Sequence, residues 1–324
     1  MTTITRKLLT SLSAALLIAG PACKPKETAP PVDPAAEAAA KEEADKAAAK
    51  KKRDDEAAAK RAQLAALPPL PGIEAPKPVK FPKPEVTKLD NGLEVIVLED
   101  HETPVVDISL VVKAGNIYAP AEHSKLAELT AYLLAEGTKK HTKAQLDQMV
   151  DATGGDTSSS PGDEFVVVGA DVLARDADLG LKVIAEEVME PAFPEDSFKK
   201  IKDMLIQSVA SEKSSPFGLA LRMGERLVFG EQSAYGRPFP SDEEINALTR
   251  EQVVAFHQRH YHPGNAVLVI AGDIKPDKAA ALAKKHLGKW KAGEAIAAPK
   301  ADKPAAIGQT IVHVIDRKGS AQAT

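Results

Sequence analysis

The stretch VTKLDNGLEVIVLED, from Val86 to Asp100, decides the fold class of this chain. Two runs of alternating apolar residues flank Asn91-Gly92, and an Asn-Gly pair in that setting is the strongest short-range signal for a β-hairpin. A hairpin pairs its strands antiparallel, which excludes a purely parallel sheet. Because helical patterns follow, we predict an α+β fold, a mixed sheet with packed helices, beginning near Val86.

Beyond the hairpin, helical and extended patterns interleave. Three further segments have the apolar runs of strands: 105–115, 164–173 and 265–274. Apolar residues with helical spacing predict helices in 125–136, 141–155, 176–191, 195–213, 241–261 and 275–290. Three of these helix starts carry the Ser/Thr-x-x-Glu/Gln pattern of a capping box: Thr142/Gln145, Ser241/Glu244 and Thr249/Gln252.

The first 23 residues have the pattern of an export signal. Arg6 and Lys7 precede an apolar run that ends in small residues and Cys23, the only cysteine. A cysteine at that boundary resembles the bacterial lipoprotein signal, so we expect lipidation of Cys23 and an envelope location. Cleavage after Ala22 without lipidation is the alternative. A transmembrane anchor is disfavoured because the apolar run is shorter than the roughly 20 residues of a span.

Residues 24–85 have the composition of a tether. They contain mostly alanine, lysine and glutamate, then a proline-rich segment, with no apolar stripe to bury. A solvated helix of roughly 45 Å and a disordered tether are both compatible with this composition. The predicted domain spans residues 86–291. A linker at 292–307 then precedes 308–324, which reads as the first strand of a truncated second domain.

Composition excludes several classes of function. The net charge is −4 and aromatic residues make up 4% of the chain, so neither a basic nor a base-stacking surface for nucleic acid is expected. A single cysteine excludes intrachain disulfides and cysteine-based metal clusters.

Four segments together resemble one family. They are LDNGLEVIVLEDHETPVVDISLVVKAGNIYAP, LAEGTKKHTKAQLDQMVDATGG, YGRPFPSDEEINALTREQVVAFHQRHYHPGNAVLVIAGDI and IVHVIDRKGSAQAT. Their order and spacing resemble the pitrilysin/insulinase family of zinc metallopeptidases, the inverzincins, in its processing-peptidase-like branch. The resemblance runs from about Pro84 to the end. It implies two similar α+β domains that close like a clamshell around a peptide, of which this chain holds the first and one strand of the second.

The resemblance also implies where the chemistry belongs. The family signature H-x-x-E-H lies on the helix before a Gly-Thr turn, and its two histidines bind zinc while its glutamate is the general base. Aligned on Gly137-Thr138, the histidine positions hold Glu128 and Tyr132, and the base position holds Ala131.

A glutamate on a later helix is the family's third zinc ligand. Aligned on Pro216, that position holds Ser208, 76 positions after Tyr132 and close to the family's usual separation. All four functional positions are therefore degenerate. Catalytic zinc needs three protein ligands and a water, so we expect no metal and no catalytic residue.

The histidines outside the signature were considered as an alternative metal site. His257, His260 and His262 form a cluster at a helix end, with no carboxylate placed to complete a ligand set. We expect them to face solvent or to cap the helix. His123 and Glu128 have the wrong spacing for a ligand pair.

The emptied signature on a retained fold favours a non-catalytic subunit. Its expected partners are an active H-x-x-E-H homologue in a heterodimer, a peptide or unfolded-protein substrate, and the membrane through a lipid anchor. An envelope-anchored scaffold or peptide-binding protein without a protease partner is the alternative. An active zinc metallopeptidase is disfavoured, because both ligands and base are missing.

Overall fold

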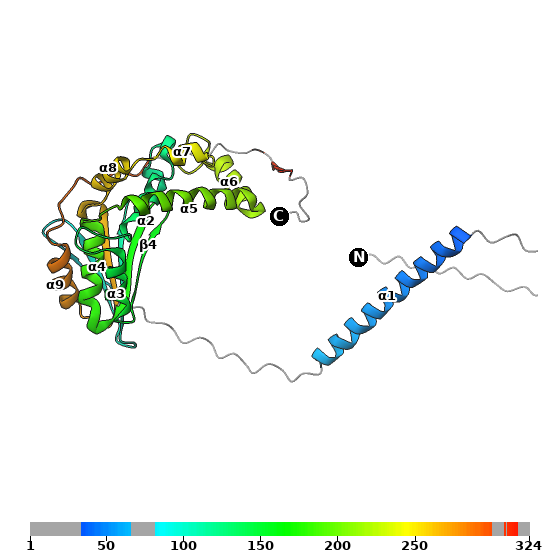
Figure 1. Ribbon diagram of the computed structural model, residues 1–324. Coiled ribbons are helices and arrows are strands. Elements are labelled where there is room, and N and C mark those ends of the chain that lie inside the picture. The colour runs from blue at the N-terminus through cyan, green and yellow to red at the C-terminus, as the bar shows by residue number, and fades with distance from the viewer. Residues whose placement is uncertain (1–33, 66–81, 300–307, 309, 317–324) are drawn as a thin grey trace, which may run out of the picture. The chain divides into compact units, whose positions relative to one another are not determined.

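The computed structural model describes residues 34–65, 82–299, 308 and 310–316. The chain divides into two compact units, residues 1–78 and 79–324. In the first unit, α1 (Pro34–Ala65) is a single helix of 32 residues (Figure 1). Cys23 and the predicted export signal lie outside the described residues. Among the helices that are described, none is both long and apolar enough to span a bilayer.

The second unit is built on a six-stranded sheet. In chain order its strands are β1 (Glu85–Lys88), β2 (Glu94–Glu99), β3 (Val105–Val112), β4 (Asp156–Pro161), β5 (Val166–Leu173) and β6 (Ala266–Gly272). In space the order is β1-β2-β6-β3-β5-β4. Only β2 and β6 run parallel, and every other neighbouring pair is antiparallel. The predicted mixed sheet and its opening hairpin are confirmed.

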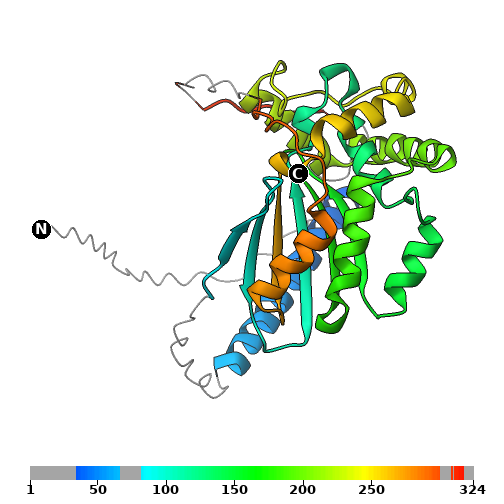
Figure 2. The ribbon, with the colours of Figure 1, turned by 90° about the vertical axis from the view of Figure 1, so that its left-hand side faces the viewer.

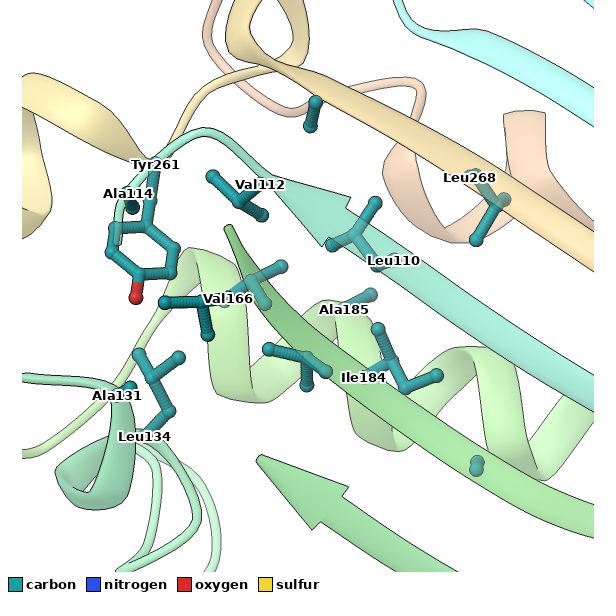
Figure 3. Packing of buried hydrophobic residues seen from close by; sticks show 14 of the residues in the cluster. Leu110, Val112, Ala114, Ala131, Leu134, Val166, Ile184, Ala185, Tyr261 and Leu268 are labelled. Atoms are coloured by element: carbon teal, nitrogen blue, oxygen red, sulfur yellow. The ribbon is translucent and has the colours of Figure 1, made fainter. Parts of the chain in front are cut away.

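One face of the sheet carries the core. The helices on this face are α3 (Lys143–Asp151), α4 (Ala177–Met189) and α9 (Pro276–Leu287) (Figure 2). Alternate strand residues such as Leu110, Val166 and Leu268 point to Ile184 of α4 in a closed apolar cluster (Figure 3). Gly180 lets α4 approach closely, because a Cβ there would meet the side chain of Ile108 at 3.1 Å.

A second group of helices gathers at one end of the sheet (Figures 1 and 2). They are α2 (Leu126–Leu134), α5 (Glu195–Ser214), α6 (Pro216–Phe229), α7 (Asp242–Asn246) and α8 (Arg250–His260). Four 3₁₀ turns join the elements: Asn116–Tyr118, Ala121–His123, Ala174–Asp176 and Pro263–Asn265. Helix α2 packs against β4, α5 and α8, so it lies at the centre of this group.

Two elements escaped the sequence prediction. Strand β4 was missed because its sequence, DTSSSP, has no apolar residue in alternation. Helix α6 was missed as well. The strand predicted at 308–324 stays a prediction: of this segment, the described residues 310–316 have no regular structure and are exposed.

Candidate functional site

Helix α2 is the scaffold of the candidate site. Leu126, Leu129, Leu133 and Leu134 form its predicted apolar stripe, and all four are buried. The helix ends at Leu134, and Gly137 takes a positive φ of 121° in the turn that follows. This backbone conformation favours glycine. The alignment of the signature positions on Gly137-Thr138 therefore starts from a turn that does follow the end of a helix.

The first histidine position is occupied by an ion pair. The carboxylate of Glu128 accepts from the Lys125 ammonium at 2.5 Å, three residues earlier on the same surface. Only 13% and 14% of the two side chains are exposed, so solvent screens this pair less than an open surface pair. The only carboxylate of the emptied signature is thus already matched to a cation.

The second histidine position holds a phenol that stays protonated. Tyr132 is half-buried, and burial, followed by the charge of Glu128, raises the pKa of its hydroxyl above the usual value. A phenol must ionise to bind zinc well, and both causes oppose ionisation.

Of the other two signature positions, one is buried in the core and the other is exposed. Ala131 is wholly buried in the apolar core, where Figure 3 shows it beside Leu134. Ser208 lies on the exposed side of α5, away from the buried residues Leu205 and Val209. Since α5 packs against α2, the predicted third-ligand helix does face the signature helix.

These residues do not fit a zinc ion. The donor set consists of a carboxylate paired with an ammonium, a neutral phenol and a serine hydroxyl. Zinc in proteins takes histidine, thiolate or carboxylate ligands. In the part of the chain that the structure describes, no three His, Cys, Asp or Glu side chains converge in a way that could hold a metal.

The histidine cluster is also no metal site, and its predicted exposure is a correction. His260 and His262 are buried, and the ring of His260 stacks on Phe256 at 4.2 Å between centroids. The Nε2 of half-buried His257 donates to the carbonyl of Val188 at 2.9 Å, near the end of α4, so this residue has a capping role. Burial lowers the pKa of His257 and of His260 to about 4, which keeps both neutral. Packing at the end of α8, including the stack on Phe256, therefore encloses His260 and His262, whereas His257 is half-buried.

His123 and Glu128 do not form a pair. The Nε2 of His123 lies 2.8 Å from the Nε2 of Gln252 on α8, whereas Glu128 bonds to Lys125. His123 thus links the loop before α2 to a neighbouring helix.

Three polar links that sequence patterns did not reveal hold α2 in place. Ser159 of β4 donates its hydroxyl to the carbonyl of Ala131 at 2.7 Å. Ser197 of α5 donates to the carboxylate of Glu136 at 2.7 Å. The guanidinium of Arg237 donates to the carbonyls of Asn116 and Ala119 at 3.0 and 2.8 Å in the loop before α2. These contacts join residues distant in sequence, so no local signal marks them.

The uncovered face of the sheet holds a cavity of about 530 Å³. Asp107 and Asp171 line it together with apolar residues of β2, β3 and β5. It lies where β3 begins, whereas α2 follows the other end of that strand, and none of the four signature positions lines it. The cavity is therefore separate from the emptied site.

Two family models match the chain. Residues 94–223 match the model described as insulinase, peptidase family M16, and residues 247–323 match the model of the peptidase M16 inactive domain. The first match spans β2 to the middle of α6 and includes all four signature positions. The second begins inside the predicted domain of residues 86–291 and extends through the predicted linker.

Similar proteins support the same assignment. An uncharacterized zinc protease of Rickettsia felis is 26% identical over 210 residues, covering 64% of this chain and 51% of the relative. An uncharacterized zinc protease of Mycobacterium leprae is 27% identical, covering 62% of this chain and 45% of that protein. A zinc protease of Helicobacter pylori is 25% identical, with coverages of 64% and 47%.

Solved structures show the same fold. The crystal structure of a peptidase M16 inactive domain from Pseudomonas fluorescens has a TM-score of 0.61 at 27% identity, covering 69% of this chain and 54% of that one. A protease from Helicobacter pylori has a TM-score of 0.62 at 23% identity, with coverages of 68% and 54%. The chain thus spans about half the length of the relatives it matches.

Proposed function

The chain belongs to the insulinase family of peptidases, M16, and we propose that it is a non-catalytic member that pairs with an active H-x-x-E-H homologue and helps to bind its peptide substrate. The observation that carries this proposal is the Lys125–Glu128 ion pair. At the position of the first zinc-binding histidine, the chain has a carboxylate with its own internal counterion. The charge of Glu128 is therefore balanced within the chain, which supports a position that needs no metal.

The position of the general base is likewise occupied by a residue that cannot do its chemistry. A general base must be able to accept a proton at the reacting water. Ala131 has no such group, and its methyl is packed into the core. Replacement of ligand, base and ligand by packed or paired residues supports retention of the fold for a purpose other than hydrolysis.

Strand β4 supports the peptide-binding part of the proposal. It is an edge strand, so the strand addition by which many proteins bind extended peptides is open to it. It also packs against α2, and Ser159 bonds to Ala131. A peptide added to this edge would run past the emptied site. Its cleavage would then need a metal and base supplied by a partner.

The envelope location rests on the sequence of the first 23 residues. We propose that Cys23 is lipidated after export and that residues 24–85, which include α1, hold the domain away from the membrane. An envelope scaffold without a protease partner is the competing function. It would share the anchor and lack the pairing.

Co-purification tests the proposal. The tagged chain is mixed with the H-x-x-E-H homologue from the same genome, and the cleavage rate of an extended peptide by the homologue is measured with and without it. We expect a stable complex and faster cleavage, with no cleavage and no bound zinc for this chain alone. Failure to pair would favour the scaffold. Stoichiometric zinc with chelator-sensitive cleavage by this chain alone would overturn the non-catalytic assignment.

A further inference from the structure

Two cavities with a common wall lie at the end of α8. One, of about 670 Å³, is lined by the ends of α4 and α8 and by the segment that follows α9. The other, of about 600 Å³, is lined by the end of α8 and by residues 293–297. Gln258, His262 and Gly293 line both cavities, whereas none of the four signature positions lines either of them. This region is therefore separate from the emptied site.

The side chain of His262 is buried without a hydrogen-bond partner. Only 5% of this residue is exposed, and its Nδ1 is enclosed with no donor or acceptor within reach. None of the other described residues bonds to its Nε2 either. A buried polar group without a partner costs free energy, so a ligand that bonds to this ring would remove that cost.

Two glycines allow the backbone to enclose the ring of His262. A Cβ added at Gly293 would lie 2.5 Å from the Cγ of His262, and one added at Gly264 would lie 2.7 Å from the carbonyl oxygen of Gly293. The segment after α9 can therefore lie against the ring only because both positions lack a side chain. Backbone contacts thus fix the ring at the wall that the two cavities share.

The unpaired charges that line the two cavities are mostly positive. Arg259 lines the smaller cavity, and Lys289 and Lys291 line the larger one. Within the described part of the chain, no carboxylate forms an ion pair with any of these three side chains. All three are exposed, so their long side chains are free to turn toward a ligand.

The other ionisable groups of the lining do not cancel this charge. Glu190 is already paired with Lys140 at 2.8 Å, which leaves Glu294 as the unpaired carboxylate among the described residues of the lining. His257 also lines the larger cavity, and burial lowers its pKa to about 4, so it is neutral at pH 7. Three unpaired cations therefore stand against one unpaired carboxylate.

We propose that this region binds a phosphate group, and we call Gln258, Arg259, His262, Lys289 and Lys291 the His262 site. The ring of protonated His262 and the amide of Gln258 would donate to the phosphate oxygens, while the three cations balance its charge. The excess of positive charge argues against a metal cation as the ligand. A bound phosphate would also tie the segment after α9 to the end of α8.

Protonation of His262 links this binding to pH. Burial lowers the pKa of His262, so its ring is neutral at pH 7 in the free protein. A bound anion favours the charged ring and raises that pKa. Binding should therefore tighten as the pH falls. The pKa values of His257 and His260 lie at about 4, so these two neighbours stay neutral above pH 5 and do not contribute.

Calorimetric titration of the full chain with inorganic phosphate at constant ionic strength tests the proposal. We expect saturable binding, with roughly a tenfold loss of affinity for His262→Phe, which keeps a ring and removes its donor. Lys289→Gln combined with Lys291→Gln changes two exposed positions, so the fold is retained, and should weaken binding by a similar factor. Lys275→Gln combined with Lys278→Gln is the matched control, since both lysines are exposed near the start of α9 and line neither cavity. It should change the affinity by less than about twofold.

Two further probes test the pH linkage and the source of the phosphate. Sulfate stays doubly charged, so it should bind the wild type more tightly at pH 5 than at pH 8, and His262→Phe should lose most of this difference. Vesicles that contain phosphatidic acid, compared with phosphatidylcholine vesicles, show whether the phosphate belongs to a lipid headgroup.

Binding of either phosphate probe that His262→Phe and the Lys289/Lys291 variant weaken, and that the control does not, supports the site. Absence of binding to inorganic phosphate and to the vesicles, or variants that bind like the wild type, would overturn it. These measurements use this chain alone, so their outcome does not depend on the proposed pairing.

Discussion

The hydroxyl of Ser159, on edge strand β4, donates to the backbone carbonyl of Ala131, at the position where active relatives are expected to carry the general base. The bond joins an edge strand to the helix on which the degenerate signature positions were predicted. It holds both elements in register although the sequence between them contains another helix and a turn.

We predict that Ser159→Ala destabilises the domain by about 1 kcal/mol, the usual net contribution of such a hydrogen bond. Ser158→Ala is the matched control, since Ser158 is exposed on the same strand and should change stability by less than about 0.5 kcal/mol. Urea unfolding followed by circular dichroism measures both. Equal effects would mean that the link to Ala131 is not what stabilises β4.

The alignment of the emptied site predicts that zinc binding can be restored. The triple variant Glu128→His, Tyr132→His, Ser208→Glu should bind one zinc per chain, because the three ligands then lie on two packed helices. Ala131 is left unchanged, since it is buried. Bound zinc is measured by mass spectrometry of the metal after dialysis.

A shifted ligand is the control for this graft. Replacing Ser208→Glu by Gln207→Glu turns the third carboxylate by about 100° around α5, so zinc affinity should fall at least tenfold. Equal affinity for both variants would show that Ser208 is not the third-ligand position.

The buried carboxyl of Glu187 should make the folded domain less stable as the pH rises. It is 2% exposed on α4, its Oε2 has no hydrogen-bond partner, and burial raises the pKa of its carboxyl to about 8. Between its ordinary pKa of 4.5 and pH 8 the folded state holds a proton that the unfolded state has lost, so stability falls across this window. Glu187→Gln should remove that decline and stabilise the protein by a few kcal/mol at pH 9.

Unfolding free energies at pH 4, 6 and 9 test this prediction. The two proteins should differ little at pH 4, where both side chains are neutral. Glu94→Gln, at an exposed position of β2, is the control and should show the wild-type dependence on pH. If the stability of Glu187→Gln relative to the wild type does not rise between pH 4 and pH 9, the raised pKa is wrongly assigned to Glu187.

Three aspartates lie in one row across the open face of the sheet. Asp156 pairs in register with Asp171, and Asp171 with Asp107. Partial burial, then the hydrogen bond and charge of Asp107, raise the pKa of Asp171. Like charges in direct opposition destabilise a sheet, so Asp171→Asn should raise the midpoint of thermal unfolding at pH 7. The gain should shrink toward pH 3 and in high salt, and a gain independent of both would argue against charge repulsion.

Local signals predicted most of the fold. Asn91-Gly92 predicted the β1–β2 hairpin, and Gly92 has the positive φ of 93° that such turns favour. All three capping boxes are present. These features succeed because a turn or a cap depends on residues three or four positions apart. Strand β4 depends instead on pairing with β5, which DTSSSP does not signal.

For the candidate site, too, local sequence predicted some features and missed those that depend on distant residues. The four degenerate positions Glu128, Ala131, Tyr132 and Ser208 were predicted from residue identity and register alone. Their surroundings were not, because the burial of Ala131, the protonated state of Tyr132 and the bond from Ser159 arise between elements distant in sequence. The histidines near residue 260 were misread for the same reason, since stacking on Phe256 is a property of the packed helix end.

By itself, the sequence determined the fold class and the family resemblance and predicted the loss of the zinc signature, because each depends on residue identity at short or regular spacing. The tertiary structure decided what replaced the chemistry: the Lys125–Glu128 pair in a nearly closed setting, and a polar edge strand bonded to the helix beside it. It also decided which apolar residues of α6 are exposed, such as Phe217, Leu221 and Val228, and which are half-buried, such as Leu219, Met223 and Phe229. Amphipathic spacing shows that a helix has two faces, and only packing decides which of them meets the core.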